Sequence, residues 1–165
     1  MKRLICLMLV AIMLLSFVSC KKDETPEPPK PEDVKSVSDI YALDNNKMNF
    51  STLYVVKNEG GIVTFVADYY EHREGIPEEP FEPYWGIVRV QLGNVSTYLS
   101  GDYSIITFDG AISPTELQMG DEIICHHDYA NENISLPPIK YAYNLFYTGN
   151  VKIIENYYDP SQVTN

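Results

Sequence analysis

The sequence predicts an all-β domain, and the preferred architecture is an antiparallel β-sandwich of about seven to eight strands. Apolar and polar side chains alternate with a period of two, as in the row Val63, Phe65, Ala67 and Tyr69, which is typical of strands with one buried face. Short runs of this kind are separated by glycine and proline turn signals. No run shows a convincing helical period of 3.6 residues. A small closed β-barrel is the alternative, because the same short strands also build barrels.

The expected strands follow residue 50. We place them near residues 51–57, 61–70, 84–92, 95–99, 103–108, 121–128, 139–147 and 150–157. Glu59-Gly60-Gly61 links the first two strands. Gly93-Asn94 and Gly149-Asn150 are each expected to form a type II′ hairpin, because glycine takes a positive φ at the first turn position. The prolines at 77, 80 and 83 indicate a loop over 71–83, and 114–120 can hold one turn of helix.

Two further apolar rows are expected on the later strands. The first row consists of Tyr84, Val88, Val90 and Leu92, and the second of Tyr141, Tyr143, Leu145 and Tyr147. Each row would place its side chains on one face of its strand. Two short motifs resemble parts of known folds. LSGDYSI at 99–105 resembles the turn and tyrosine that lead into a strand of immunoglobulin-like domains, and LQMGDEI at 117–123 is similar to the turn before a late strand in oligonucleotide-binding-type barrels.

The first 20 residues have the order of a secretory signal. Lys2 and Arg3 precede a 15-residue apolar run from Leu4 to Val18, which is shorter than the roughly 20 residues of a spanning helix. The small Ser19 and Cys20 then resemble the lipobox of a bacterial lipoprotein signal cut by signal peptidase II. This resemblance implies cleavage after residue 19 and a lipid on the Cys20 thiol. Lys21-Lys22-Asp23-Glu24 is similar to the charged segment of surface-exported Bacteroidetes lipoproteins, so the expected location is the outer membrane, at the cell surface.

The chain then divides into three parts. Residues 20–38 carry four prolines among charges and no aromatic residue, a composition that does not fold by itself. We expect a lipidated cysteine with a proline-rich, extended tether there. A single all-β domain is expected over 39–158, and a flexible tail over 159–165.

Charge and cysteine content exclude several classes of protein. Removal of residues 1–19 takes Lys2 and Arg3 but no acid, so the net charge changes from −11 to −13. Nucleic acid would repel a chain this acidic, and we expect no nucleic-acid partner. Once Cys20 is acylated, Cys125 is the only remaining thiol, so no internal disulfide can form. The expected partners are the membrane, through the anchor, and an envelope ligand.

The stretch richest in side chains that can bind a metal or react is Cys125-His126-His127-Asp128. In a strand, Cys125 and His127 would point one way with Ile123, while His126 and Asp128 would point the other way. At most two of these groups converge, and zinc needs three or four ligands. We therefore expect a buried Cys125 and a surface pair of His126 with Asp128, and we expect no metal or other cofactor.

The aromatic residues suggest a ligand surface. On the strand at 84–92, Trp85, Arg89 and Gln91 share the face opposite the apolar row. A tryptophan flanked by polar groups can stack on a sugar ring, and Tyr70 and Tyr84 could border it. The alternative is that a loop or second sheet covers Trp85. No nucleophile motif is present, so the expected function is a non-enzymatic binding module for a glycan or protein. A structural part of an envelope assembly and a hydrolase are the alternatives.

Overall fold

The computed structural model describes residues 30–68, 85–92, 103–133 and 137–162. Several sequence predictions lie outside these residues. They are the signal over 1–19, the lipidation site Cys20, the first part of the tether, the loop 71–83, the Gly93-Asn94 hairpin and the strand at 95–99. Among the described residues, no helix has the length and apolar character needed to cross a membrane.

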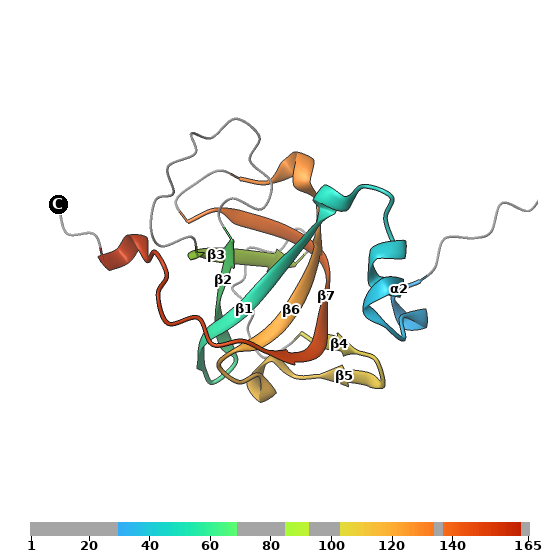
Figure 1. Cartoon of the computed structure of the whole chain (residues 1–165), viewed down its shortest axis with the longest axis horizontal. Coiled ribbons are helices and arrows are strands. Elements are labelled where there is room, and N and C mark those ends of the chain that lie inside the picture. The colour runs from blue at the N-terminus through green and yellow to red at the C-terminus, as the bar shows by residue number, and fades with distance from the viewer. Residues whose placement is uncertain (1–29, 69–84, 93–102, 134–136, 163–165) are drawn as a thin grey trace, which may run out of the picture.

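One seven-stranded sheet dominates the structure and confirms the all-β prediction (Figure 1). The strands are β1 (Phe50–Glu59), β2 (Ile62–Asp68), β3 (Trp85–Leu92), β4 (Ile105–Thr107), β5 (Gly110–Ile112), β6 (Asp121–His127) and β7 (Ile139–Val151). The one α-helix described is α2 (Val37–Ala42), and single 3-10 turns lie at Pro31–Asp33, Lys47–Asn49, Pro114–Glu116, Tyr129–Asn131 and Pro160–Gln162. The turn at Pro114–Glu116 agrees with the helical turn expected over 114–120.

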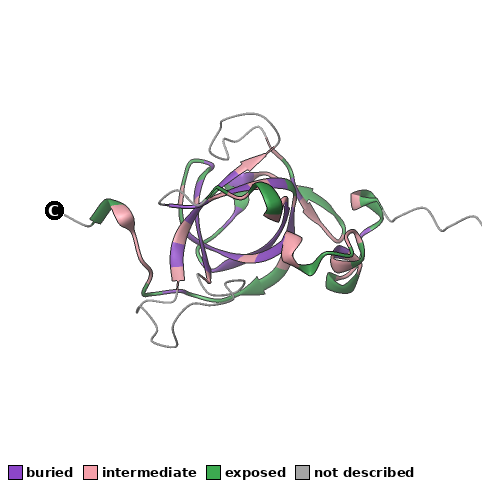
Figure 2. Cartoon of the chain, turned by 90° about the horizontal axis from the view of Figure 1, so that it is seen from above, coloured by how far each residue is buried: buried purple, intermediate pink, exposed green. Residues whose placement is uncertain are grey.

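The sheet closes on itself. Its order is β3-β2-β1-β6-β7-β4-β5, and β3 also pairs with β7. Five strands therefore form a ring, which Figure 2 shows from above with most of its buried residues. This is the barrel alternative, and its strand order is that of a five-stranded Greek-key barrel of the oligonucleotide-binding type. The pairings of β7 with β3 and with β4 are parallel and the others antiparallel.

The barrel interior is filled by alternate side chains of the ring strands. Val63, Phe65 and Ala67 of β2 are all at most 8% exposed, as the alternation predicts. Val88 and Val90 of β3 join the same core. The prediction that Tyr141, Tyr143, Leu145 and Tyr147 share one face of β7 is wrong in part. Leu145 is buried, but Tyr143 is 56% exposed.

A shift of register explains the exposure of Tyr143. His126 pairs with Asn144 and His127 with Ala142, so β7 has an extra residue between them. Such a bulge interrupts the alternation, so residues an even number of positions apart across it face opposite sides of the sheet. Ala142 and Leu145 therefore both face the core, although they are three apart in the sequence.

The link at Gly149-Asn150 is not a hairpin. β7 runs through both residues to Val151, and the strand expected at 150–157 ends there. Gly149 has φ +80° and lies where the β6–β7 register shifts between Asp121 and Ile123. A glycine at positive φ serves a bulge as well as a turn. At Gly60-Gly61 the same signal forms the predicted turn between β1 and β2.

Two clusters cover the outside of the barrel, so β1 is buried on both faces. The first cluster consists of Val34, Ile40, Phe50, Ile124 and Phe146, and it holds α2 against the barrel. Val34 is only 2% exposed. Packing therefore begins inside the stretch 20–38 that the sequence predicts to be tether. The second cluster, Tyr54, Val56, Val66 and Ile154, joins β1 and β2 to the segment that follows β7.

Candidate ligand-binding site

The barrel wall is interrupted between β2 and β3. Their pairing runs from Asp68 with Trp85 to Phe65 with Val88. Beyond that point β3 pairs with β7, from Arg89 opposite Ile139 onward. No pair within the described residues joins 62–64 to β3. The two strands therefore separate, and the interior of the barrel approaches the surface between them.

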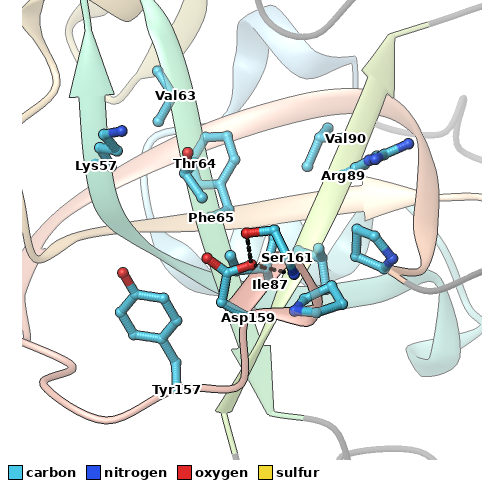
Figure 3. Close-up of a pocket in the computed structure, with 13 residues that line it drawn as sticks. Lys57, Val63, Thr64, Phe65, Ile87, Arg89, Val90, Tyr157, Asp159 and Ser161 are labelled. Carbon is cyan, nitrogen blue, oxygen red and sulfur yellow. Dashed lines mark hydrogen bonds between the residues drawn. The ribbon is translucent and has the colours of Figure 1, made fainter. Parts of the chain in front are cut away.

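A hollow of about 290 Å³ lies at this separation (Figure 3). Its lining comes from the end of β1, from β2 and β3, from Pro137, and from the chain after β7. The residues are Lys57, Val63, Thr64, Phe65, Ile87, Val88, Arg89, Val90, Pro137, Tyr157, Asp159, Pro160 and Ser161. Core valines and Phe65 form an apolar floor, and hydroxyl and charged groups surround it. Apolar walls with a few polar groups are typical of ligand sites.

The C-terminal segment is fixed to β3 by its backbone. The N–H of Tyr158 donates to the carbonyl of Trp85 at 2.7 Å, and the N–H of Ile87 donates to the carbonyl of Tyr158 at 3.0 Å. Asp159 then closes a turn, accepting from the Ser161 backbone N–H at 2.9 Å and from its hydroxyl at 2.7 Å. These bonds lower the pKa of Asp159, led by the one from the Ser161 side chain. Asp159 is therefore a fixed negative charge beside the hollow.

Positive groups also border the hollow. Arg89 is exposed on β3. The Nζ of Lys57 lies 3.0 Å from the Oε1 of Glu59, with both side chains more than half exposed. A surface pair of this kind contributes little to stability. Lys57 and Arg89 therefore place positive charge at the edge of the hollow, in a chain that is otherwise strongly acidic.

The predicted ligand residues are separated by the structure. Arg89 lines the hollow, whereas Trp85 and Gln91 are half-buried and do not. The ring of Trp85 meets Tyr54 edge-on at 5.4 Å between centroids, and the Nζ of Lys152 lies 4.7 Å from its centre. Tyr70 and Tyr84 lie outside the described residues. The sequence prediction divided the segment 157–161 between the end of a strand and a flexible tail, and it missed the role of this segment in the hollow. The turn residues Asp159-Pro160-Ser161 were the signal that could have indicated a fixed turn.

Cys125 and His127 face the barrel interior, as the alternation predicts. Both are fully buried, and Nε2 of His127 lies 2.9 Å from the hydroxyl of Ser51. Burial raises the pKa of the Cys125 thiol to about 12. No group of three or more potential metal ligands from His, Cys, Asp and Glu occurs within the described part of the chain.

His126 faces the other way but has a different partner from the one expected. Its ring stacks on Phe50 at 4.8 Å and meets Tyr143 edge-on at 5.1 Å. Its Nε2 lies 3.4 Å from Oδ2 of Asp44. Asp128 instead accepts from the amide of Asn131. The expected pair of His126 with Asp128 is therefore wrong, and His126 joins the barrel to the chain after α2.

We expect Cys125 to resist alkylation in the folded protein. A thiol of pKa about 12 is almost entirely protonated at pH 8, so iodoacetamide should react at least ~1000-fold more slowly than with a free cysteine. The chain from residue 21 carries this thiol alone, so mass spectrometry with and without denaturant measures it directly. Labelling of the folded chain at the rate of free cysteine would contradict the buried position.

No protein-family model, curated protein or solved structure matches this chain. Fold and site together define a small closed β-barrel with a ligand-sized hollow in its wall. The arguments about function start from that geometry.

Proposed function

We propose that the chain is a lipid-anchored, non-enzymatic binding module of a bacterial cell envelope, which takes a glycan or protein ligand at the hollow between β2 and β3. The observation that carries this proposal is the hollow itself, about 290 Å³ in volume and walled by four separate parts of the chain. Its size is close to the lower end of small-ligand pockets, roughly 300 Å³.

The side chains that line the hollow suit ligand binding better than catalysis. β2 and β3 are rigid because their inward side chains belong to the barrel core. Asp159 is held by Ser161, so it offers a fixed charge rather than a mobile proton, and Lys57 adds a positive charge at the edge of the hollow. Such preorganised polar groups orient a ligand on an apolar floor.

The anchor of the proposed module is Cys20. Its lipobox-like setting favours acylation, and the charged segment that follows it favours a location at the outer membrane, with the domain at the cell surface. Several acyl chains would hold the protein firmly, because each buried CH₂ contributes about 0.8 kcal/mol.

C20A should release the protein from the membrane. Without the thiol no lipid can be attached, so the protein should move from the membrane pellet to the soluble fraction after high-speed centrifugation. C125A is the matched control, because it removes the buried cysteine and should leave the protein in the pellet. Tight membrane association of the C20A protein would defeat the anchoring proposal.

R89A tests the position of the ligand site. A panel of envelope and dietary glycans and of envelope proteins is titrated into the mature chain, and binding is followed by calorimetry. For the ligand that binds, R89A should weaken affinity about tenfold, because it removes a charged group at the edge of the hollow. The control is K35A, which removes an exposed lysine before α2. Equal affinities for the R89A and unaltered chains would place the ligand elsewhere.

A role in an envelope assembly is the second candidate. Three large apolar residues, Met119, Val151 and Ile153, are 53–63% exposed. A Cβ on Gly120 would lie 2.6 Å from Cδ1 of Ile153 and 3.0 Å from Cγ1 of Val151, so these side chains gather over Gly120. Exposed apolar groups of this kind mark contact surfaces when they form a patch. V151K would weaken an assembly through this patch and leave ligand binding at the hollow unchanged.

A further inference from the structure

The chain after β7 crosses the outside of the barrel. We call residues 152–162 the strap. Ile154 of the strap is 8% exposed and packs with Tyr54, Val56 and Val66 of β1 and β2. Tyr157 packs against the same cluster. The strap therefore covers the outer face of the strands that also carry the hollow.

The strap occupies the edge of β3 that β7 leaves uncovered. β7 pairs with β3 from Arg89 onward, and the N–H of Arg89 donates to the carbonyl of Pro138 at 2.9 Å. Before that point the edge is taken by Tyr158, in an isolated parallel bridge with Gly86. The two hydrogen bonds of this bridge use the carbonyl of Trp85 and the N–H of Ile87. These are the groups to which a partner's extended segment would bind in strand addition.

Backbone hydrogen bonds hold the strap at its two ends, where the N–H of Lys152 donates to the carbonyl of Gly120 and Tyr158 pairs with β3. Residues 152–157 form no strand, and Ile154 is the one buried side chain of the strap. Ile153 faces solvent at 53% exposure although it is apolar. Segments with few buried contacts open locally at low free energy. The strap is thus the part of this face that can leave while the barrel stays folded.

We propose that the strap, which belongs to the same chain, competes with a peptide of a partner protein for the edge of β3 at Trp85 and Ile87. The partner is an extended, apolar and aromatic peptide segment of an envelope protein, which pairs with β3 at Trp85 and Ile87 after the strap has left. Four of the residues that line the hollow, at 157 and 159–161, belong to the strap, so its release also reshapes the hollow. This inference rests on the proposed binding function and names its ligand class and its regulation.

Hydrogen exchange on the unaltered mature chain tests the release of the strap. The Ile87 amide is bonded to the strap, whereas the Arg89 amide is bonded to Pro138. If the strap opens locally, the Ile87 amide should exchange at least ~10-fold faster than the Arg89 amide. Equal rates for the two amides, both limited by global unfolding, would overturn the proposal without bearing on ligand binding.

A peptide with the sequence of residues 152–162, KIIENYYDPSQ, tests the competition. The labelled peptide is titrated by fluorescence anisotropy into the full mature chain and into the I154S/Y157A chain, whose strap is weakened. The weakened chain should bind at least ~10-fold more tightly, because a tethered competitor has a high effective concentration. A scrambled peptide is the control. Equal binding of the peptide to both chains, no binding to either, or equal binding of the scrambled peptide would refute the competition.

The glycan titration separates the two proposals. A glycan that binds the unaltered chain, with no peptide binding to either chain, would leave the binding function standing and overturn the peptide assignment. Tight peptide binding to the weakened chain, with no glycan binding, would support the strap and identify the ligand class. The single tryptophan gives a second signal, because Lys152 of the strap lies over its ring.

Discussion

F65A should lower the free energy of unfolding by about 3–5 kcal/mol. Phe65 is 1% exposed and lies between Val55 of β1 and Val88 of β3 in the sheet. Truncation removes a large apolar side chain from water-free surroundings and leaves a cavity. The core strands around Phe65 limit collapse of the cavity, which keeps the loss within this range.

Urea unfolding of the mature chain, followed by circular dichroism, measures the effect. The midpoint should fall while the slope stays constant, as expected for a two-state change in stability. I62A on the same strand is the matched control. Ile62 is 54% exposed, so its truncation should change the free energy of unfolding by less than about 0.5 kcal/mol. Similar losses for both variants would contradict the inward placement of Phe65.

E132Q should destabilise the protein by about 3 kcal/mol, because it leaves the Lys140 ammonium without its partner. The Nζ of Lys140 lies 2.8 Å from Oε1 of Glu132, and the two side chains are 8% and 20% exposed. Lys140 lies two residues before Ala142 of the core on β7. Lys140 pairs with Val90 of β3, whose side chain belongs to the core of the barrel.

A double-mutant cycle separates the pair from its surroundings. K140M alone leaves the carboxylate, but the combined E132Q/K140M chain removes both charges and should recover most of the lost stability. The exposed pair of Lys57 and Glu59, at 3.0 Å, is the control. E59Q should change the free energy of unfolding by less than about 0.5 kcal/mol. An effect of E132Q no larger than that of E59Q would show that water reaches Lys140.

Short β-branched and aromatic runs between turn signals predicted β1, β2, β3 and β6, because both features are local properties of the chain. The alternation of apolar residues predicted the buried faces of β2 and β3. It also predicted the inward Cys125 and His127. It misplaced Tyr143 because a bulge changes the face without changing the composition. The signal at Gly149-Asn150 has the same ambiguity, since a positive φ suits both a hairpin and a bulge.

Contacts between segments that are far apart in the sequence could not be predicted from these local patterns. The pairing of β3 with β7 decides between a sandwich and a closed barrel, and local patterning contains no information about it. For the site, Arg89 was predicted to be an exposed contact. The surroundings of Trp85 were not predicted, because Lys152, which lies over its ring, comes from the far end of the chain. The partner of His126, which is Asp44, could not be predicted either, because the two residues are far apart in the sequence.

The closure of β3 against β7 also predicts an order of folding. β1 and β2 are adjacent in sequence and can pair at once through the Gly60-Gly61 turn. β7 is the last strand of the chain, and its first residues must reach the end of β3. Contacts between residues far apart in sequence form slowly, because their loop-closure entropy is lost before they stabilise the chain. The strap follows β7 in the chain, so the edge of β3 at Trp85 and Ile87 is covered only after β7 and the strap have been synthesised.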